Sequence, residues 1–320
     1  MVCEVAANAL QDGRLKRQEM ILIQPRTTGY RAGCFPARSV KMKTAQMTPI
    51  LVVLVASATG ARTAVPAVVP LAPWAGLLRS VTVTVDGTAH PFVFDTGGGE
   101  TVITPEVAAA VGCTPYGRSI GFRMSGERVE FEHCDNVALR LGQVALTRDP
   151  VGVFDLKSIL PAGLPRTDGV LSLRSFRDRP VTIALGAGRL TLETAGSLAA
   201  RVRRMRPLTI RIATGPSGAE TTVHVAARVG GQRVWLLLDS GNGDPALVAP
   251  HVAAMVGLKG AEGAAVIQID GVGPVQLPIR PQSIIYDGVL GAGFIQDWIL
   301  TFDLPSARAW AAPADRASGK

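Results

Sequence analysis

The alternation of apolar and polar residues predicts strands in the chain that follows residue 77. Polar and apolar residues alternate over residues 80–85, which is typical of a strand with one buried face. Asp86 and Gly87 then predict a hairpin turn, and the apolar residues 92–94 predict a short, buried return strand. Similar short apolar runs, separated by glycine and proline, continue along the chain, so we expect a mainly β fold.

The predicted return strand runs into an aspartate, and this arrangement occurs twice. Residues 92–99 read FVFDTGGG, and residues 236–243 read LLLDSGNG. In both, three apolar residues precede an aspartate, a small hydroxyl residue and a glycine. Glycine permits the sharp turn that must follow. We therefore expect Asp95 and Asp239 at the exposed ends of two buried strands.

The repeat extends well beyond these two motifs. Residues 105–112, PEVAAAVG, match residues 250–257, PHVAAMVG, and a proline near the start with a glycine at the end predicts a short helix in each. The sequence DGVL occurs at residues 168–171 and again at residues 287–290. This period is too long for a solenoid of small units. The sequence therefore predicts an internal duplication, with two β-rich lobes and one short helix in each.

The N-terminal region predicts an export signal. Lys41 and Lys43 precede the apolar residues 50–56, and small residues follow that run. The run is too short to span a bilayer, so we expect a secretory signal and no stable membrane span after its removal. Because a signal normally starts at the terminus, we hypothesise that translation begins at Met42 or Met47. The expected location is periplasmic or secreted.

The positive charge of the chain lies mostly in this first region. The chain has a net charge of +8, and residues 1–64 contain nine Lys or Arg against three Asp or Glu. A nucleic-acid interface needs basic residues clustered on the folded part, so we expect no nucleic-acid partner. Four arginines between the two copies could bind an acidic partner or form a solvated linker, and we favour the linker; they are Arg201, Arg203, Arg204 and Arg206.

These patterns divide the chain into five parts. We expect a presequence over residues 1–64, an N-terminal lobe over 65–196, a basic linker over 197–206, a C-terminal lobe over 207–313 and a tail over 314–320. Cys113 and Cys134 lie in the first lobe and, in an oxidising compartment, form either a disulfide or two buried free thiols. No spacing suits a metal site, and we expect no metal or other cofactor.

Two duplicated aspartate loops predict a pseudo-twofold arrangement in which the carboxylates meet. Two carboxylates a few ångströms apart share a proton, so Asp95 and Asp239 would provide a general base and a general acid for a water molecule held between them. The hydroxyls of Thr96 and Ser240 are suited to hydrogen-bond the opposite loop. Gly97 and Gly241 would let backbone N–H groups approach the carboxylates.

These residues resemble the two-lobed aspartic peptidases of the pepsin/retropepsin type, and bacterial periplasmic retropepsin-like proteins are the closer likeness. The resemblance covers roughly residues 77–312 and carries Asp-Thr-Gly, Asp-Ser-Gly and the two DGVL segments. It implies a bilobal, acid-protease-like β-barrel fold and hydrolysis of peptide bonds, with Asp95 and Asp239 as the catalytic dyad. It also implies a peptide or unfolded-protein substrate and a monomer, because one chain carries both lobes.

The sequence departs from the family pattern at three positions. Gly98 and Asn242 stand where the family usually has Ser, Thr or Ala, and Ser172 replaces a glycine of the segment that passes under the catalytic loop, whereas Gly291 keeps it. We place the substrate-covering flap at residues 119–126, with four candidate residues, Ser119, Phe122, Ser125 and Gly126.

Two other classes of protein remain open. A peptide- or partner-binding module on the same fold could keep the loops without the activity. An ATP-using phosphotransferase also has two Asp-x-Gly loops, but the export signal and the lack of long alternating helices disfavour it.

Overall fold

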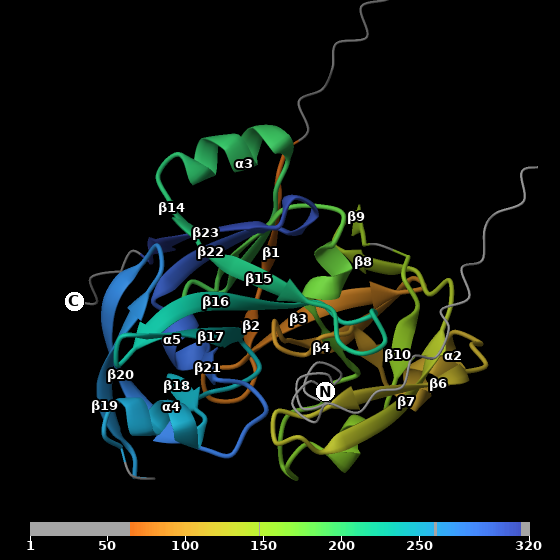
Figure 1. Ribbon diagram of the computed structural model, residues 1–320. Coiled ribbons are helices and arrows are strands. Elements are labelled where there is room, and N and C mark those ends of the chain that lie inside the picture. The colour runs from red at the N-terminus through yellow and green to blue at the C-terminus, as the bar shows by residue number, and fades with distance from the viewer. Residues whose placement is uncertain (1–64, 147, 259–260, 315–320) are drawn as a thin grey trace, which may run out of the picture. The chain divides into compact units, whose positions relative to one another are not determined.

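The computed structural model describes residues 65–146, 148–258 and 261–314 (Figure 1). The expected presequence and its start sites, and the end of the expected tail, lie outside these residues. The described part is built from three sheets, one in each half of the chain and one that takes strands from both halves. No helix in this part is long and apolar enough to cross a membrane.

The sheet of the N-terminal lobe has the strand order β6-β7-β10-β5-β11-β4-β3-β8-β9, with β2 paired to β3. It begins with the predicted hairpin, in which Val83 pairs with His90. Its members are β2 (Ala72–Pro73), β3 (Arg79–Val85), β4 (Thr88–Phe94), β5 (Val102–Ile103), β6 (Tyr116–Phe122), β7 (Arg128–Cys134), β8 (Leu139–Leu141), β9 (Val144–Ala145), β10 (Val151–Val153) and β11 (Gly169–Leu171).

The sheet of the C-terminal lobe has the order β15-β16-β17-β21-β18-β20-β19, and a further pairing of β16 with β19 closes it into a barrel. It repeats the central pairing of the first lobe, because β17 runs parallel to β21 as β4 runs parallel to β11. Its members are β15 (Ile210–Ala213), β16 (Thr222–Val229), β17 (Gln232–Asp239), β18 (Ala246–Val248), β19 (Gly263–Ile269), β20 (Gly273–Pro281) and β21 (Gly288–Gly291).

The third sheet joins the two halves of the chain, in the order β1-β13-β12-β22-β23-β14. At its centre Thr182 pairs with Thr301, and their hydroxyls are 2.8 Å apart. These two threonines are equivalent positions of the sequence repeat, so the pseudo-twofold axis passes between them. The strands are β1 (Ala67–Pro70), β12 (Val181–Ala184), β13 (Arg189–Leu192), β14 (Arg206–Leu208), β22 (Trp298–Asp303) and β23 (Arg308–Pro313).

In the described residues, four short α-helices accompany the sheets. The two repeated segments form α2 (Pro105–Ala110) and α4 (Pro250–Met255), and both are followed by a glycine with positive φ, Gly112 and Gly257. The prediction of one helix per lobe omitted α5 (Ala292–Ile295), which follows β21, and α3 (Ala195–Val202). Three 3₁₀ turns complete the elements: η2 (Leu156–Ser158), η3 (Leu173–Phe176) and η4 (Leu304–Ser306).

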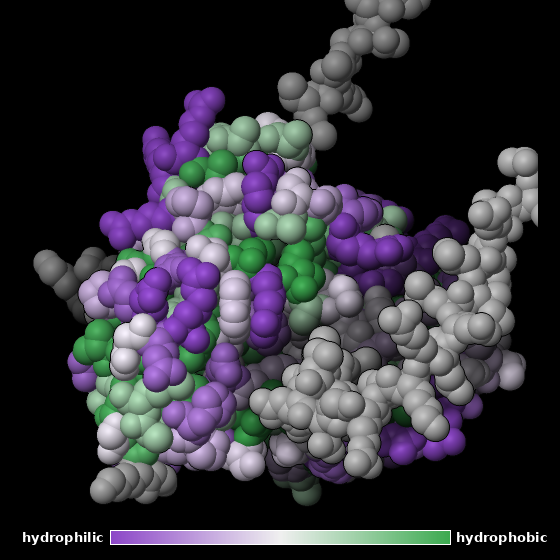
Figure 2. Space-filling model, viewed as in Figure 1, coloured by the Kyte–Doolittle hydropathy of each residue, from purple (hydrophilic) through white to green (hydrophobic). Residues whose placement is uncertain are grey.

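Helix α3 occupies most of the segment that was expected to be a basic linker. Thr194 and Ser197 form a reciprocal capping box that starts the helix. Of the arginines, Arg201 pairs with Glu193, and Arg206 donates to the carbonyl of Val272. Figure 2 shows hydrophilic side chains projecting beside the end of the molecule where Figure 1 places α3.

Candidate active site

In each lobe the aspartate lies at the end of a buried central strand. Phe94 at the end of β4 is fully buried, and the N–H of Asp95 donates to the carbonyl of Leu171 in β11. In the second lobe Asp239 ends β17 and pairs with Gly291 of β21. Because β4 and β17 are each held by a parallel neighbour inside a sheet, the backbones of the two aspartates are rigidly placed.

The hydroxyl residues that follow the aspartates lock the two loops together. The Thr96 hydroxyl donates to the carbonyl of Leu238 at 2.7 Å, and the Ser240 hydroxyl donates to the carbonyl of Phe94 at 3.0 Å. In return, the N–H of Ser240 donates to the Thr96 hydroxyl at 2.9 Å, and the N–H of Thr96 donates to the Ser240 hydroxyl at 3.0 Å. Both side chains are buried, so this reciprocal network fixes the separation of the loops.

The glycines of the two motifs allow the carboxyl groups to meet. The N–H of Gly97 donates to Asp95 Oδ1 at 2.8 Å, and the N–H of Gly241 donates to Asp239 Oδ1 at 2.9 Å. A Cβ atom at Gly97 would collide with the carboxyl group of Asp239, and one at Gly241 would collide with that of Asp95. The two carboxyl groups therefore lie side by side, close enough that each one alters the pKa of the other.

Burial and mutual repulsion set the ionisation of this pair. Burial raises the pKa of Asp95 above its ordinary value, although hydrogen bonds from Asp239 and from three backbone N–H groups oppose the shift. Burial also raises the pKa of Asp239, and the charge of Asp95 raises it further. Two neighbouring carboxyl groups that repel each other when both are charged favour a state in which one of them keeps its proton. The pair is therefore suited to hold a single proton, with one carboxyl acid and one carboxylate.

Local packing accommodates the departures from the family pattern. A Cβ at Gly98 would lie 3.1 Å from Asp95 Oδ2, so this position touches the dyad but has no hydroxyl to offer it. Asn242 instead accepts a hydrogen bond from the N–H of Asp244 at 2.9 Å. Ser172 is fully buried, and its hydroxyl donates to the carbonyl of Gly99 at 3.2 Å. That serine therefore ties the segment after β11 to the first aspartate loop.

The predicted flap residues lie in the hairpin formed by β6 and β7. Ser119 and Phe122 are in β6, and Ser125 and Gly126 are in the turn, which is closed by a 2.8 Å bond from the N–H of Arg123 to the carbonyl of Glu127. The tip of the hairpin reaches the C-terminal lobe.

The contact at the hairpin tip centres on Met124, which the sequence did not single out. Its carbonyl accepts the N–H of Ile285 at 3.0 Å, and its side chain packs with Ile284 and Tyr286 against three buried residues of the second lobe, Leu237, Leu247 and Val289.

A pocket of about 180 Å³ opens beside Asp95. Its walls come from the first aspartate loop, the β6–β7 hairpin, the segment 154–159, and two C-terminal segments that contribute Glu220 and Tyr286. Phe122 is the one flap candidate among its lining residues. The pocket is mostly apolar and lies next to the half-buried carboxyl pair and beneath the hairpin, so it is suited to bind part of a small ligand or a side chain.

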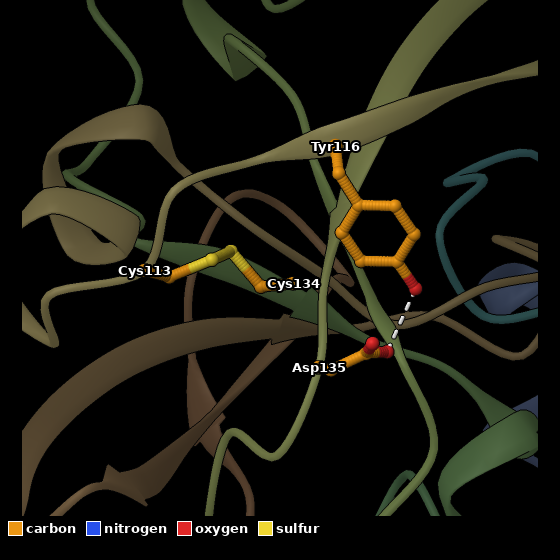
Figure 3. Close-up of a disulfide and its surroundings, with 4 residues drawn as sticks. All are labelled: Cys113, Tyr116, Cys134 and Asp135. Carbon is orange, nitrogen blue, oxygen red and sulfur yellow. Dashed lines mark hydrogen bonds between the residues drawn. A yellow bond between two sulfur atoms is a disulfide. The ribbon is translucent and has the colours of Figure 1, made fainter.

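A disulfide fixes the base of the hairpin, as Figure 3 shows. Cys113, after α2, is bonded to Cys134 at the end of β7. Beside it, the Tyr116 hydroxyl donates to Asp135 Oδ1 at 2.7 Å. The neighbouring His133 Nε2 lies 2.9 Å from Glu100 Oε1, so the disulfide also holds the strand that carries this hydrogen bond.

Comparisons with known proteins agree with this geometry. A family described as "Aspartyl protease" matches residues 81–175, which include the first aspartate loop, the hairpin and the first DGVL segment. The chain has the fold of the pepsin- and retropepsin-like aspartic peptidases. No curated protein matches it in sequence.

Three solved structures resemble this aspartic-peptidase fold over most of the chain. Basic 7S globulin from soybean is 11% identical with a TM-score of 0.53, and conglutin gamma from lupine seeds is 10% identical with a TM-score of 0.54; each match covers 78% of this chain and 95% of the other. Aspartic proteinase from Irpex lacteus is 13% identical over 80% of this chain and 99% of its own, with a TM-score of 0.49. At these identities the first two likenesses concern the fold alone.

Several residues at the site were not found from the sequence. Glu100 directly follows the first motif, but a carboxylate after a glycine turn is ordinary there. Glu220 and Tyr286 lie far from both motifs in the chain, and only the fold brings them to the pocket. Among the described residues no three His, Cys, Asp or Glu side chains form a group that could hold a metal ion.

Proposed function

We propose that this protein is an aspartic endopeptidase, which hydrolyses peptide bonds with a water molecule held between Asp95 and Asp239. The observation that carries the proposal is the carboxyl pair, half-buried where the two repeated loops meet and with the pKa of both groups raised. The aspartic-peptidase fold and the hairpin that reaches across to the second lobe support it.

The chemistry follows from the single shared proton. Asp95, the ionised carboxyl, accepts a proton from the water molecule. At the same time the water oxygen attacks the carbonyl carbon of the peptide. Asp239, whose pKa is raised by burial and by the charge of Asp95, gives its proton to the carbonyl oxygen. A tetrahedral diol results. When it collapses, the C–N bond breaks, one diol proton returns to the dyad, and the leaving nitrogen receives the proton that Asp95 had taken.

Nothing in this scheme requires a covalent intermediate, and the backbone supports the charged state. The N–H of Gly97 donates to Asp95 Oδ1 at 2.8 Å, so the carboxylate form of Asp95 is stabilised during the attack. The Thr96 and Ser240 network holds the geometry without contacting the reacting atoms. These two residues are therefore positioning residues.

The proposal is tested by the binding of a statine-type peptide, whose hydroxyl mimics the tetrahedral intermediate. We expect the mimic to raise the melting temperature of the protein, because it binds only the folded state. We expect the shift to shrink in both Asp95→Asn and Asp239→Asn, whereas a matched peptide without the statine hydroxyl should bind all three proteins alike. A module that only grips peptides would bind the two peptides equally well, and that result would refute the proposal.

A further inference from the structure

The pocket beside Asp95 contains two glutamates that the proposed chemistry does not use. Glu100 is 4% exposed, and its Oε1 pairs with His133 at 2.9 Å. Its Oε2 is buried and has no hydrogen-bond partner among the described residues. Glu220 comes from the other lobe and lines the same pocket. A buried carboxylate oxygen without a partner is costly, and Glu100 lines the pocket, so this oxygen points to a ligand that would supply a donor.

Three glycines make room for Glu220. Its side chain lies close to the positions that Cβ atoms would take at Gly99 of the aspartate loop, Gly121 of β6 and Gly215 of its own loop. The N–H of Thr221 donates to the carbonyl of Gly99 at 2.9 Å, and this bond ties the loop that carries Glu220 to the first aspartate loop. The side chain of Glu220 makes no hydrogen bond or ion pair with another described residue.

The positive groups around the pocket do not balance this negative charge. His133 offsets one carboxylate at most. Arg174 lies near Glu100 but pairs with Asp149 at 3.2 Å, and Arg123 at the rim pairs with Glu127 at 3.1 Å. Burial raises the pKa of both Glu100 and Glu220, and each group is also repelled by a neighbouring carboxylate. Among the described residues that line the pocket, no unpaired cation is left to face Glu220.

The remaining walls of the pocket are apolar. They include aromatic and aliphatic side chains from the hairpin and the segment after β10, namely Phe122, Val129, Phe131, Phe154, Leu156 and Ile159. A lysine or arginine side chain has the matching character, because its methylene stem packs on apolar surface while its charged end needs a polar partner.

We infer that Glu100 and Glu220 form a specificity subsite that takes the lysine or arginine side chain of a peptide next to the bond to be cut. This inference rests on the proposed function, since it places a residue of that substrate. The cationic end would pair with Glu220 and with the free oxygen of Glu100, and the stem would pack along the aromatic wall. Because the two carboxyls must ionise to pair with it, the preference for a basic residue should strengthen as the pH rises.

The subsite is tested with two statine-type peptides that differ only in lysine or norleucine, placed in turn on each side of the statine. Norleucine keeps the stem of lysine and removes its charge. At neutral pH we expect the lysine peptide to bind at least about tenfold more tightly for one of the two placements, equal to about 1.4 kcal/mol. The ratio should fall to near one in Glu220→Gln and should be unchanged in Glu262→Gln, an exposed carboxylate of the C-terminal lobe that does not line the pocket.

Glu100→Gln provides a second variant, and its melting temperature shows whether loss of the His133 pair unfolds the protein. Equal binding of the two peptides by the unaltered protein would overturn the subsite, as would a lysine preference that survives in Glu220→Gln. Cleavage of the corresponding peptides with an ordinary amide bond is followed in parallel. Lysine-selective binding without cleavage would support the subsite and refute hydrolysis. Cleavage without a lysine preference would support hydrolysis and refute the subsite.

Discussion

At the scale of single residues, the site depends on the lack of a side chain at Gly97, Gly98 and Gly241. Gly97 and Gly241 have no Cβ because the opposite aspartate occupies that space. Gly98 differs, since its φ is not in the left-handed region and a Cβ there would lie 3.1 Å from Asp95 Oδ2, a tight contact that a small shift of the carboxyl group relieves. The position can accept a small side chain that acts on the dyad.

Gly98→Ser should therefore change the pH dependence of the dyad. A serine hydroxyl that donates to the carboxylate of Asp95 favours its charged form and lowers its pKa. We expect the acidic limb of the activity profile to move to lower pH than in Gly98→Ala, which has the same Cβ and no hydroxyl. Superimposable profiles of the two variants would show that this position does not bond the dyad.

At the scale of elements, the β6–β7 hairpin is fixed at both ends. Its base carries the disulfide between Cys113 and Cys134, and its tip is bonded to Ile285 of the second lobe. The hairpin bears Phe122 and Phe131 of the pocket. Its stability therefore affects both the fold and the pocket.

Replacing both cysteines by alanine should lower the free energy of unfolding by about 3 kcal/mol, the amount expected for closing a loop of this length. The two cysteines are 21 positions apart. The difference is measured by urea unfolding of the oxidised protein and of the double variant Cys113→Ala/Cys134→Ala. Treatment with a reductant should bring the unaltered protein to the stability of the variant; if it does not, the disulfide contributes little and the loss has another cause.

The helices and strands also show how much of the fold can be predicted from the sequence. The repeated runs predicted β4, β17, α2 and α4, because short apolar strands and Pro-to-Gly helices are local signals. Helix α3 has a local signal as well, the Thr194–Ser197 capping box, but the arginines that follow drew the interpretation toward a linker. The pocket could not be predicted, because the position of Glu220 depends on a bond between loops more than one hundred residues apart in the chain.

At the scale of the whole molecule, the repeat found in the sequence is the symmetry of the structure. Thr96 and Ser240 bond each other's loops, and Thr182 pairs with Thr301 in the shared sheet. In both places residues at equivalent positions of the repeat contact each other. The dyad lies where this symmetry brings two acids together, at a cost to the folded state.

That cost should be visible as a dependence of stability on pH. The folded protein keeps a proton on Asp239 at pH values where the unfolded chain, with a pKa of 3.8, has lost it. Stability attributable to this group therefore falls as the pH rises above that value. We expect Asp239→Asn to melt at a higher temperature than the unaltered protein near neutral pH, with the difference shrinking toward acid pH.

Thermal unfolding at a series of pH values measures this difference, and Glu127→Gln provides a control for the loss of an exposed carboxylate. A difference in melting temperature between Asp239→Asn and the unaltered protein that does not change with pH would mean that Asp239 is not protonated in the folded state. The proposed general acid would then be wrong.

The most direct measurement is the cleavage of an unfolded protein substrate across acidic to neutral pH, with the fragments identified by mass. Asp95→Asn and Asp239→Asn are compared with the unaltered protein, and all three are first shown to be folded. We predict that the unaltered protein cuts internal peptide bonds and that either substitution abolishes cleavage. Cleavage that persists in both variants, or its absence from the folded, unaltered protein at every pH, would contradict hydrolysis by this aspartate pair.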